Sequence, residues 1–357
     1  MSIRSRTSAT CVVLTLVAPA LASGSSSSSV HGAATTQAGS WTVTASMSAP
    51  RAQITATALG NGRALVVGGA GLTTTELYDP ASGTWLAGGT LKESRGLHVA
   101  VRLADGRVLV AGGGTYHASA ELYDPATNSW TPTGSMRVGR IDATATLLRD
   151  GRVLVVGGLA PDGSGVQASA ELFDPATGRW TPTGSLRNPR RSHSAAPLPD
   201  GTVLVAGGSN SGGTVHAAER YDPARGRWSR AGTSSTAGIA AVLLNNGRVL
   251  VIGGPAAELY DPARNRWAPT GSMTAAHGGP AVLLQDGRVL VAGGGTGDVY
   301  SSGTGTWTAT GPMVFPYASA AAALLPNGQA LYAGGVDSAC QKFGGCQPLA
   351  DAELYTP

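Results

Sequence analysis

The sequence contains little charge, few cysteines and almost no lysine. Charged side chains make up 13% of the 357 residues, and Lys92 and Lys342 are the only lysines, so the net charge of +4 comes from arginine. No cluster of basic residues is interleaved with exposed aromatic residues, which argues against a nucleic-acid partner. A modest positive charge is more consistent with an anionic glycan, polymer or surface as the partner.

The three cysteines provide at most one pair in the mature chain. Cys11 falls in an N-terminal apolar segment, whereas Cys340 and Cys346 stand six positions apart in one loop. In an oxidising compartment such a pair predicts a disulfide. A metal site needs more ligands than two thiols and no histidine is near, so we predict no metal there.

The N-terminal segment has no apolar run long enough to cross a membrane. Two arginines precede a short apolar run, Cys11–Leu21, and Ala20-Leu21-Ala22 has the small-x-small pattern of a cleavage site. Residues 1–22 therefore predict a secretory signal peptide, and the serine-rich residues 23–40 predict a flexible linker. We expect a secreted or cell-envelope protein with no transmembrane segment after cleavage.

The rest of the chain is one motif repeated seven times. Each unit has a small-apolar run, an Asn-Gly or Asp-Gly pair, and a second apolar run such as Val153–Val156. The dipeptide predicts a two-residue type I′ turn, so the two runs should form a hairpin of strands A and B. The seven turns begin at Asn61, Asp105, Asp150, Asp200, Asn246, Asp286 and Asn327.

Each unit continues with a Gly-Gly pair, an aromatic residue on strand C and a tryptophan on strand D. The aromatic residue precedes its tryptophan by seven positions in six units, which predicts a fixed C–D turn and a packed aromatic pair. No helical period follows any Gly-Gly pair, so we interpret the pairs as a repeated packing requirement and not as phosphate-binding loops. The pairs begin at Gly68, Gly112, Gly157, Gly207, Gly253, Gly293 and Gly334, and the tryptophans are Trp85, Trp130, Trp180, Trp228, Trp267 and Trp307.

This order of Gly-Gly, aromatic residue and tryptophan resembles the kelch repeat over about Trp41–Pro357. The resemblance implies an all-β fold, a seven-bladed β-propeller of four-stranded antiparallel blades. The last unit stops at Pro357 without a tryptophan strand, whereas Trp41–Met47 precedes the first unit. We therefore expect residues 41–47 to complete the last blade, closing the ring and removing the open edge.

The loops between strands predict where a ligand would bind. Antiparallel strands place the A–B and C–D turns on one face and the B–C loops and D–A connections on the other. The B–C loops vary in length and are longest in blades three, four and seven, and variable loops on a rigid scaffold usually carry binding.

One position of the D–A connection holds arginine in blades one to four. The residues there are Arg51, Arg95, Arg140 and Arg190, followed by Thr236, Ala276 and Tyr317 in blades five to seven. The arginines could bridge adjacent blades, as is common in kelch propellers, or could form a clamp for an anion or carboxylate. If they form a clamp, alanine at Arg95, Arg140 and Arg190 should abolish binding of an acidic ligand without unfolding the protein.

Four other candidate ligand-binding residues stand at or shortly before the start of inner strands. His98 and His193 occupy equivalent positions, and two such histidines could in principle ligate a metal, but they are more typical of hydrogen-bonding parts of the repeat. Asp142 is the one carboxylate at the start of an inner strand, and Tyr317 replaces arginine in blade seven. A glycoside hydrolase needs two carboxylates aimed at one bond, so we predict no catalytic residue.

These features favour a secreted binding module that recognises an extracellular glycan or protein through the B–C and D–A loops. The alternatives are a carbohydrate-acting enzyme, galactose-oxidase-like or lyase- or epimerase-like, and a structural or adhesive envelope protein. Tyr116-His117 matches the Tyr-His dipeptide of galactose-oxidase-like copper radical oxidases, but their Tyr-linked cysteine and the histidine of their C-terminal domain have no counterpart that we can identify. GxSxG, HExxH and EF-hand motifs are also missing, so we predict no cofactor.

Overall fold

The computed structural model describes residues 39–69, 71–115, 117–160, 165–338 and 346–357. The predicted signal peptide and almost all of the predicted linker lie outside these ranges. Within the described residues we find no helix with the length and apolarity that a membrane span requires.

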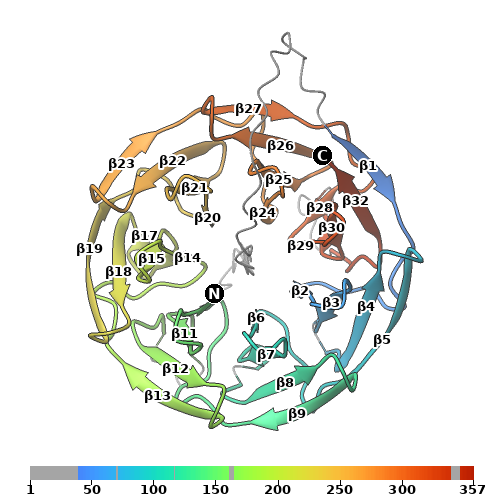
Figure 1. The fold of residues 1–357 in the computed structure, drawn as a ribbon, viewed down its shortest axis with the longest axis horizontal. Coiled ribbons are helices and arrows are strands. Elements are labelled where there is room, and N and C mark those ends of the chain that lie inside the picture. The colour runs from blue at the N-terminus through green and yellow to red at the C-terminus, as the bar shows by residue number, and fades with distance from the viewer. Residues whose placement is uncertain (1–38, 70, 116, 161–164, 339–345) are drawn as a thin grey trace, which may run out of the picture.

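The described residues form seven four-stranded antiparallel sheets arranged in a ring, which confirms the predicted seven-bladed propeller (Figure 1). In each blade strand A lies nearest the propeller axis and strand D forms the outer rim. Blades one to three consist of β2 (Thr55–Ala58), β3 (Ala64–Val67), β4 (Thr74–Asp79) and β5 (Thr84–Thr90); β6 (Val99–Arg102), β7 (Val108–Ala111), β8 (Ala120–Asp124) and β9 (Ser129–Thr133); and β10 (Thr144–Leu147), β11 (Val153–Val156), β12 (Ala170–Asp174) and β13 (Arg179–Thr183).

Blades four to six follow the same order of strands. They consist of β14 (Ser194–Pro197), β15 (Val203–Ala206), β18 (Ala217–Asp222) and β19 (Arg227–Thr233); β20 (Ala240–Leu243), β21 (Val249–Gly253), β22 (Ala256–Asp261) and β23 (Arg266–Pro269); and β24 (Ala281–Leu283), β25 (Val289–Gly293), β26 (Thr296–Ser301) and β27 (Thr306–Ala309). The B–C loop of blade four adds a small hairpin of β16 (Ser209–Asn210) and β17 (Gly213–Thr214).

Blade seven joins the two ends of the described chain. It consists of β29 (Ala321–Leu324), β30 (Ala330–Ala333), β32 (Ala352–Thr356) and β1 (Ser40–Val43), and β28 (Tyr317–Ala318) pairs with β31 (Val336–Asp337) beside it. Trp41 lies opposite Tyr355, with their ring centroids 5.2 Å apart. The N-terminal strand therefore supplies strand D of the last blade, as predicted.

The hydrophobic core is divided among the contacts between blades. Each of seven buried clusters in the described residues contains side chains from two neighbouring blades, including the pair that closes the ring. Leu65 and Val67 of β3, for example, belong to one cluster with Val108 and Val110 of β7. Strand B is apolar on both faces because it is covered by a blade on each side.

The tryptophans link each blade to the one before it. Trp180 packs against Phe173 with ring centroids 5.1 Å apart, and its indole N–H donates to the Gly134 carbonyl of the preceding blade at 2.8 Å. Trp41 makes the equivalent bond to Thr310 Oγ1 at 3.0 Å. Each tryptophan thus fixes its own C–D pair and the angle to its neighbour.

The predicted type I′ turn is wrong. Gly106 N–H donates to Leu103 O at 3.1 Å and Leu103 N–H donates to Arg107 O at 2.8 Å, so the loop has three residues, and the same bonds occur at all seven turns. Gly106 has a φ of 90°, whereas Asp105 is not in the left-handed region and accepts a bond from Arg107 N–H at 3.0 Å. An aspartate that bonds two residues ahead favours a turn followed by a left-handed glycine.

Candidate functional site

Among the described residues, five non-glycine residues around the propeller axis have left-handed backbones, which residues with a side chain rarely adopt. Each stands two positions before an innermost strand, and their φ values lie between 51° and 59°. We call them the axial ring: Gln53, Leu97, Asp142, Ser192 and Ser319. The N–H groups of Leu97, Asp142 and Ser192 each donate to the carbonyl of the ring residue in the preceding blade, at 3.0–3.2 Å. Strained backbone of this kind clusters at binding sites, so the ring marks a candidate site.

The Gly-Gly pairs fix the D–A connections beside this ring. Gly113 N–H donates to Arg140 O at 2.9 Å, and a Cβ on Gly112 would lie 2.5 Å from that same oxygen. Gly157 has the same relation to Arg190 O, again at 2.5 Å. The pairs therefore allow close approach of the next blade, as the repeated packing interpretation predicts.

The four predicted arginines are buried, and each is paired with a glutamate of strand C. Arg140 Nη2 donates to Glu171 Oε1 at 2.9 Å, and Nη1 donates to the carbonyls of Gly157 and Ser169. The side chains are at most 1% exposed. The other pairs are Arg51–Glu76 at 3.0 Å, Arg95–Glu121 at 3.2 Å and Arg190–Glu219 at 3.0 Å. Because these guanidinium groups face internal acceptors, the geometry favours the structural interpretation over a ligand clamp.

Blades five to seven fill the same place with other side chains. His277 Nε2 lies 2.8 Å from Asp298 Oδ2, and its Nδ1 lies 3.2 Å from Gly293 O, the carbonyl that corresponds to Gly157 O in blade three. Counting positions assigned Ala276 to this place. That assignment is wrong by one residue, because Ala276 is exposed and His277 takes the arginine's place.

His98 and His193 are buried between blades and are not brought together with other metal ligands. Their Nε2 atoms lie 2.9 Å from Thr55 Oγ1 and 2.8 Å from Thr144 Oγ1, each in the preceding blade. Burial, with a smaller contribution from Arg95 or Arg190, lowers the pKa of each imidazole to about 3. Among the described residues, no three His, Cys, Asp or Glu side chains come together as metal ligands.

Asp142, a member of the axial ring, has a buried carboxylate oxygen that accepts no hydrogen bond in the described structure. Its side chain is 5% exposed, its Oδ1 atom has no hydrogen-bond partner in the described structure, and burial raises the pKa of its carboxyl group. Arg191 Nη1 lies 4.0 Å from Asp142 Oδ2, and the Arg191 side chain is 42% exposed. Sequence analysis missed Arg191 because only the first arginine of the Arg190-Arg191 pair repeats between blades.

Two other predicted features lie partly outside the described residues. Cys340 is outside them, so the Cys340–Cys346 disulfide stays a prediction. Tyr116 is outside them too, and His117 Nδ1 lies 3.4 Å from Glu93 Oε2 in the B–C loop region of blade two.

Comparison with known proteins agrees with the fold. The kelch motif model matches residues 95–137 and 190–235, and no curated protein matches the chain. A solved structure of a fungal alcohol oxidase of the AA5 family, in complex with copper, superposes with a TM-score of 0.73 and 20% identity, covering 90% of this chain and 77% of that chain. At this identity the likeness is one of fold. The described residues thus form a seven-bladed β-propeller, and two regions of the chain match the kelch motif.

Proposed function

We propose that the protein is a secreted or cell-envelope binding module that takes a hydroxyl-rich extracellular ligand, a saccharide, at the axial ring. The observation that carries this proposal is Asp142, whose buried Oδ1 atom has no donor in the described structure. A buried carboxylate oxygen without a donor is costly, and a ligand hydroxyl would supply the missing bond.

The surroundings of Asp142 suit a saccharide. A sugar hydroxyl both donates and accepts, so it pairs well with a carboxylate acceptor beside a guanidinium donor. Asp142 and Arg191 provide this combination, and the partly exposed Gln53 and Ser192 stand at equivalent positions in blades one and four. The left-handed backbone of Asp142 is held by inter-blade hydrogen bonds, so the site is organised before a ligand arrives.

A glycan array followed by Asp142→Asn tests this proposal. Asparagine keeps the shape of the side chain and tolerates a positive φ, so the fold should be retained. The variant should bind the best saccharide about 10-fold more weakly or worse, since a hydrogen bond to a charged group contributes about 1.5–3 kcal/mol. Asp105→Asn, in an A–B turn on the opposite face, is the matched control and should bind normally.

Three outcomes would contradict the proposal. They are the absence of any saccharide binding, equal affinities of Asp142→Asn and wild type, and equal losses in Asp142→Asn and Asp105→Asn. A peroxide-release assay on sugars and alcohols with added copper belongs to the same experiment. Peroxide release from a sugar or alcohol would show that the protein is an oxidase and would contradict the proposal of a binding module.

A further inference from the structure

Positive charge is concentrated in one sector of the propeller. Residues 176–269, which run from the C–D turn of blade three to strand D of blade five, contain eleven arginines and five acidic residues, a net charge of +6. Since the whole chain carries +4, the remaining residues carry a net −2. A field this uneven steers charged partners toward one side of a protein.

Three of these eleven arginines share one repeat position, the residue before the strand-D tryptophan. Arg179, Arg227 and Arg266 hold it in blades three, four and five, and we call these three residues the arginine rim. All three are exposed and open the outer strands β13, β19 and β23. The other blades have small hydroxyl residues there: Ser40, Thr84, Ser129 and Thr306.

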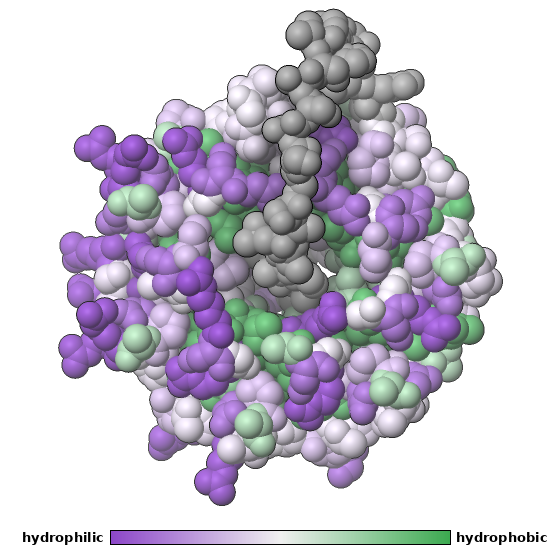
Figure 2. Space-filling model, in the orientation of Figure 1, coloured by the Kyte–Doolittle hydropathy of each residue, from purple (hydrophilic) through white to green (hydrophobic). Residues whose placement is uncertain are grey.

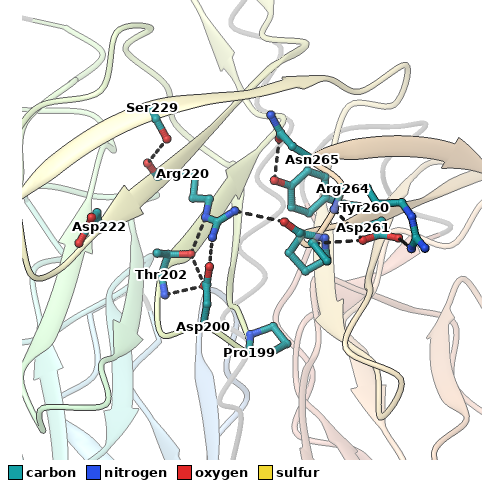
Figure 3. A network of polar contacts seen from close by, with 12 residues as sticks. Pro199, Asp200, Thr202, Arg220, Asp222, Ser229, Tyr260, Asp261, Arg264 and Asn265 are labelled. Atoms are coloured by element: carbon teal, nitrogen blue, oxygen red, sulfur yellow. Dashed lines mark hydrogen bonds and ion pairs between the residues drawn. The ribbon is translucent and has the colours of Figure 1, made fainter.

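Four of the five acidic residues of this sector pair with arginines outside the rim, and the fifth, Glu258, accepts hydrogen bonds from serine hydroxyls. Asp200 pairs with Arg220, whose guanidinium also reaches the Pro262 carbonyl of blade five, and Asp261 pairs with Arg264 at 2.9 Å (Figure 3). Asp222 pairs in the same way with Arg225. Each rim arginine stands opposite an aspartate across the C–D strand pair, but among the described residues no carboxylate lies within ion-pair distance of a rim side chain. Figure 2 shows hydrophilic side chains projecting from the edge of the disc beside β19 and β23.

The aromatic residues beside the rim are not available to stack on nucleic-acid bases. Trp228 and Trp267 pack against Tyr221 and Tyr260 with ring centroids 5.0 Å apart. Their indole N–H groups, like that of Trp180, are bonded to backbone carbonyls of the preceding blade at 2.6–2.8 Å. A single-strand binder needs free stacking platforms, so the rim is suited to a polymer recognised by charge.

We propose that the arginine rim binds an anionic polysaccharide, independently of the axial-ring site. Arginine pairs in bidentate fashion with sulfate and carboxylate groups and is weakly hydrated, which favours it over lysine at such a surface. Three equivalent arginines on consecutive blades present charge along an arc of the rim, which matches an extended chain carrying anionic groups at intervals.

The test is a triple variant, Arg179→Thr, Arg227→Thr and Arg266→Thr. Threonine is the residue that blades one and six have at this position. The matched control, Arg63→Thr, Arg107→Thr and Arg288→Thr, also removes three positive charges, from A–B turns whose arginines are paired with aspartates. Threonine is natural at that turn position too, as Thr202 in blade four. The probes are heparin and alginate, with neutral dextran and duplex DNA alongside.

The rim variant should bind heparin or alginate about 10-fold more weakly or worse, and the slope of log affinity against log salt should fall by about three. The control variant and Asp142→Asn should bind nearly as wild type does. Equal losses in the rim and control variants would show that only net charge matters and would overturn the proposal. Absence of polysaccharide binding at low salt, or tighter binding of duplex DNA, would overturn it as well.

Discussion

Blades one to four and blades five to seven differ in the side chains that accompany the buried carboxylate of strand C. In the first group a buried arginine neutralises the strand-C carboxylate, as Arg140 does for Glu171 at 2.9 Å. In the second group the carboxylate meets serine hydroxyls in blade five, His277 in blade six, and no side-chain cation in the described part of blade seven.

The comparison shows which part of the junction is constant. In all seven blades the strand-C carboxylate accepts a backbone N–H from the D–A connection that enters the blade, at 2.7–3.1 Å. The donors are Ser48, Lys92, Arg137, Arg187, Ser235, Thr274 and Val314. The carboxylate therefore anchors the connection, and the arginine is one of several ways to accommodate its charge.

The largest effect is expected from Arg140→Ala. The substitution leaves Glu171 buried without its cation, which typically costs about 3–5 kcal/mol, so the urea midpoint should fall sharply. Thr236→Ala, at the equivalent place in blade five, should cost about 1 kcal/mol or less because no buried charge loses its partner. An Arg140→Ala protein with wild-type stability that no longer bound an acidic ligand would instead support the clamp interpretation.

Acidification should destabilise the protein through His98 and His193. Each imidazole titrates near pH 6.5 when unfolded but near 3 when folded, so the unfolded chain binds more protons between these values. The unfolding free energy should therefore fall as pH drops below about 6.5, by about 1.4 kcal/mol per pH unit for each histidine. Urea unfolding from pH 7 to pH 4 measures the pH dependence for wild type and for the double variant His98→Gln/His193→Gln. Since the carboxylates contribute equally to both proteins, the difference between the two curves reports the histidines. Parallel curves would contradict the expectation.

A smaller difference in stability is expected between alanine substitutions at the second glycines of two Gly-Gly pairs. Gly158 of blade three and Gly294 of blade six have positive φ values, 95° and 69°, so alanine is strained at both. A Cβ on Gly158 would lie 2.5 Å from Ile141 O, whereas a Cβ on Gly294 would meet nothing within 4 Å. Gly158→Ala should therefore lose about 1–3 kcal/mol more than Gly294→Ala in urea unfolding. If both variants lost the same stability, the backbone of blade three would have to shift at this contact to accommodate the new Cβ.

The fold could be predicted from the sequence because each signal in the repeat reports one geometric requirement. Tryptophan needs a carbonyl of the preceding blade, and the Gly-Gly pair must admit the next connection. Trp41 predicted ring closure because it supplied the tryptophan that the last unit lacked. The hairpin type could not be predicted from the dipeptide alone, since Asp105 bonds Arg107 N–H instead of adopting a positive φ.

The candidate site was less predictable because it depends on contacts between blades. The axial ring contains Gln53, Leu97 and Asp142, whose side chains share no chemistry, and part of its left-handed backbone is held by hydrogen bonds to neighbouring blades. The sequence marked the arginine position but not its glutamate partner. It assigned Ala276 instead of His277 to the arginine position of blade six, because the count of residues shifts by one there.

The smallest expected effect concerns the hydroxyl that replaces the guanidinium in blade seven. Tyr317 is 1% exposed, its hydroxyl has no partner in the described structure, and burial together with Glu353 and Asp351 raises its pKa. An unpaired buried hydroxyl gains nothing from folding, so Tyr317→Phe should leave stability unchanged or raise it by about 1 kcal/mol.

Tyr332 of the same blade provides the matched comparison, because its buried hydroxyl donates to Pro280 O at 2.9 Å. Tyr332→Phe should lose about 1 kcal/mol in urea unfolding, the usual net contribution of such a bond. If Tyr317→Phe lost as much, the Tyr317 hydroxyl would have a bonded partner in solution. If Tyr317→Phe is neutral, the aromatic ring alone fills the space of the arginine, and the anchoring in blade seven comes from Glu353 and the backbone.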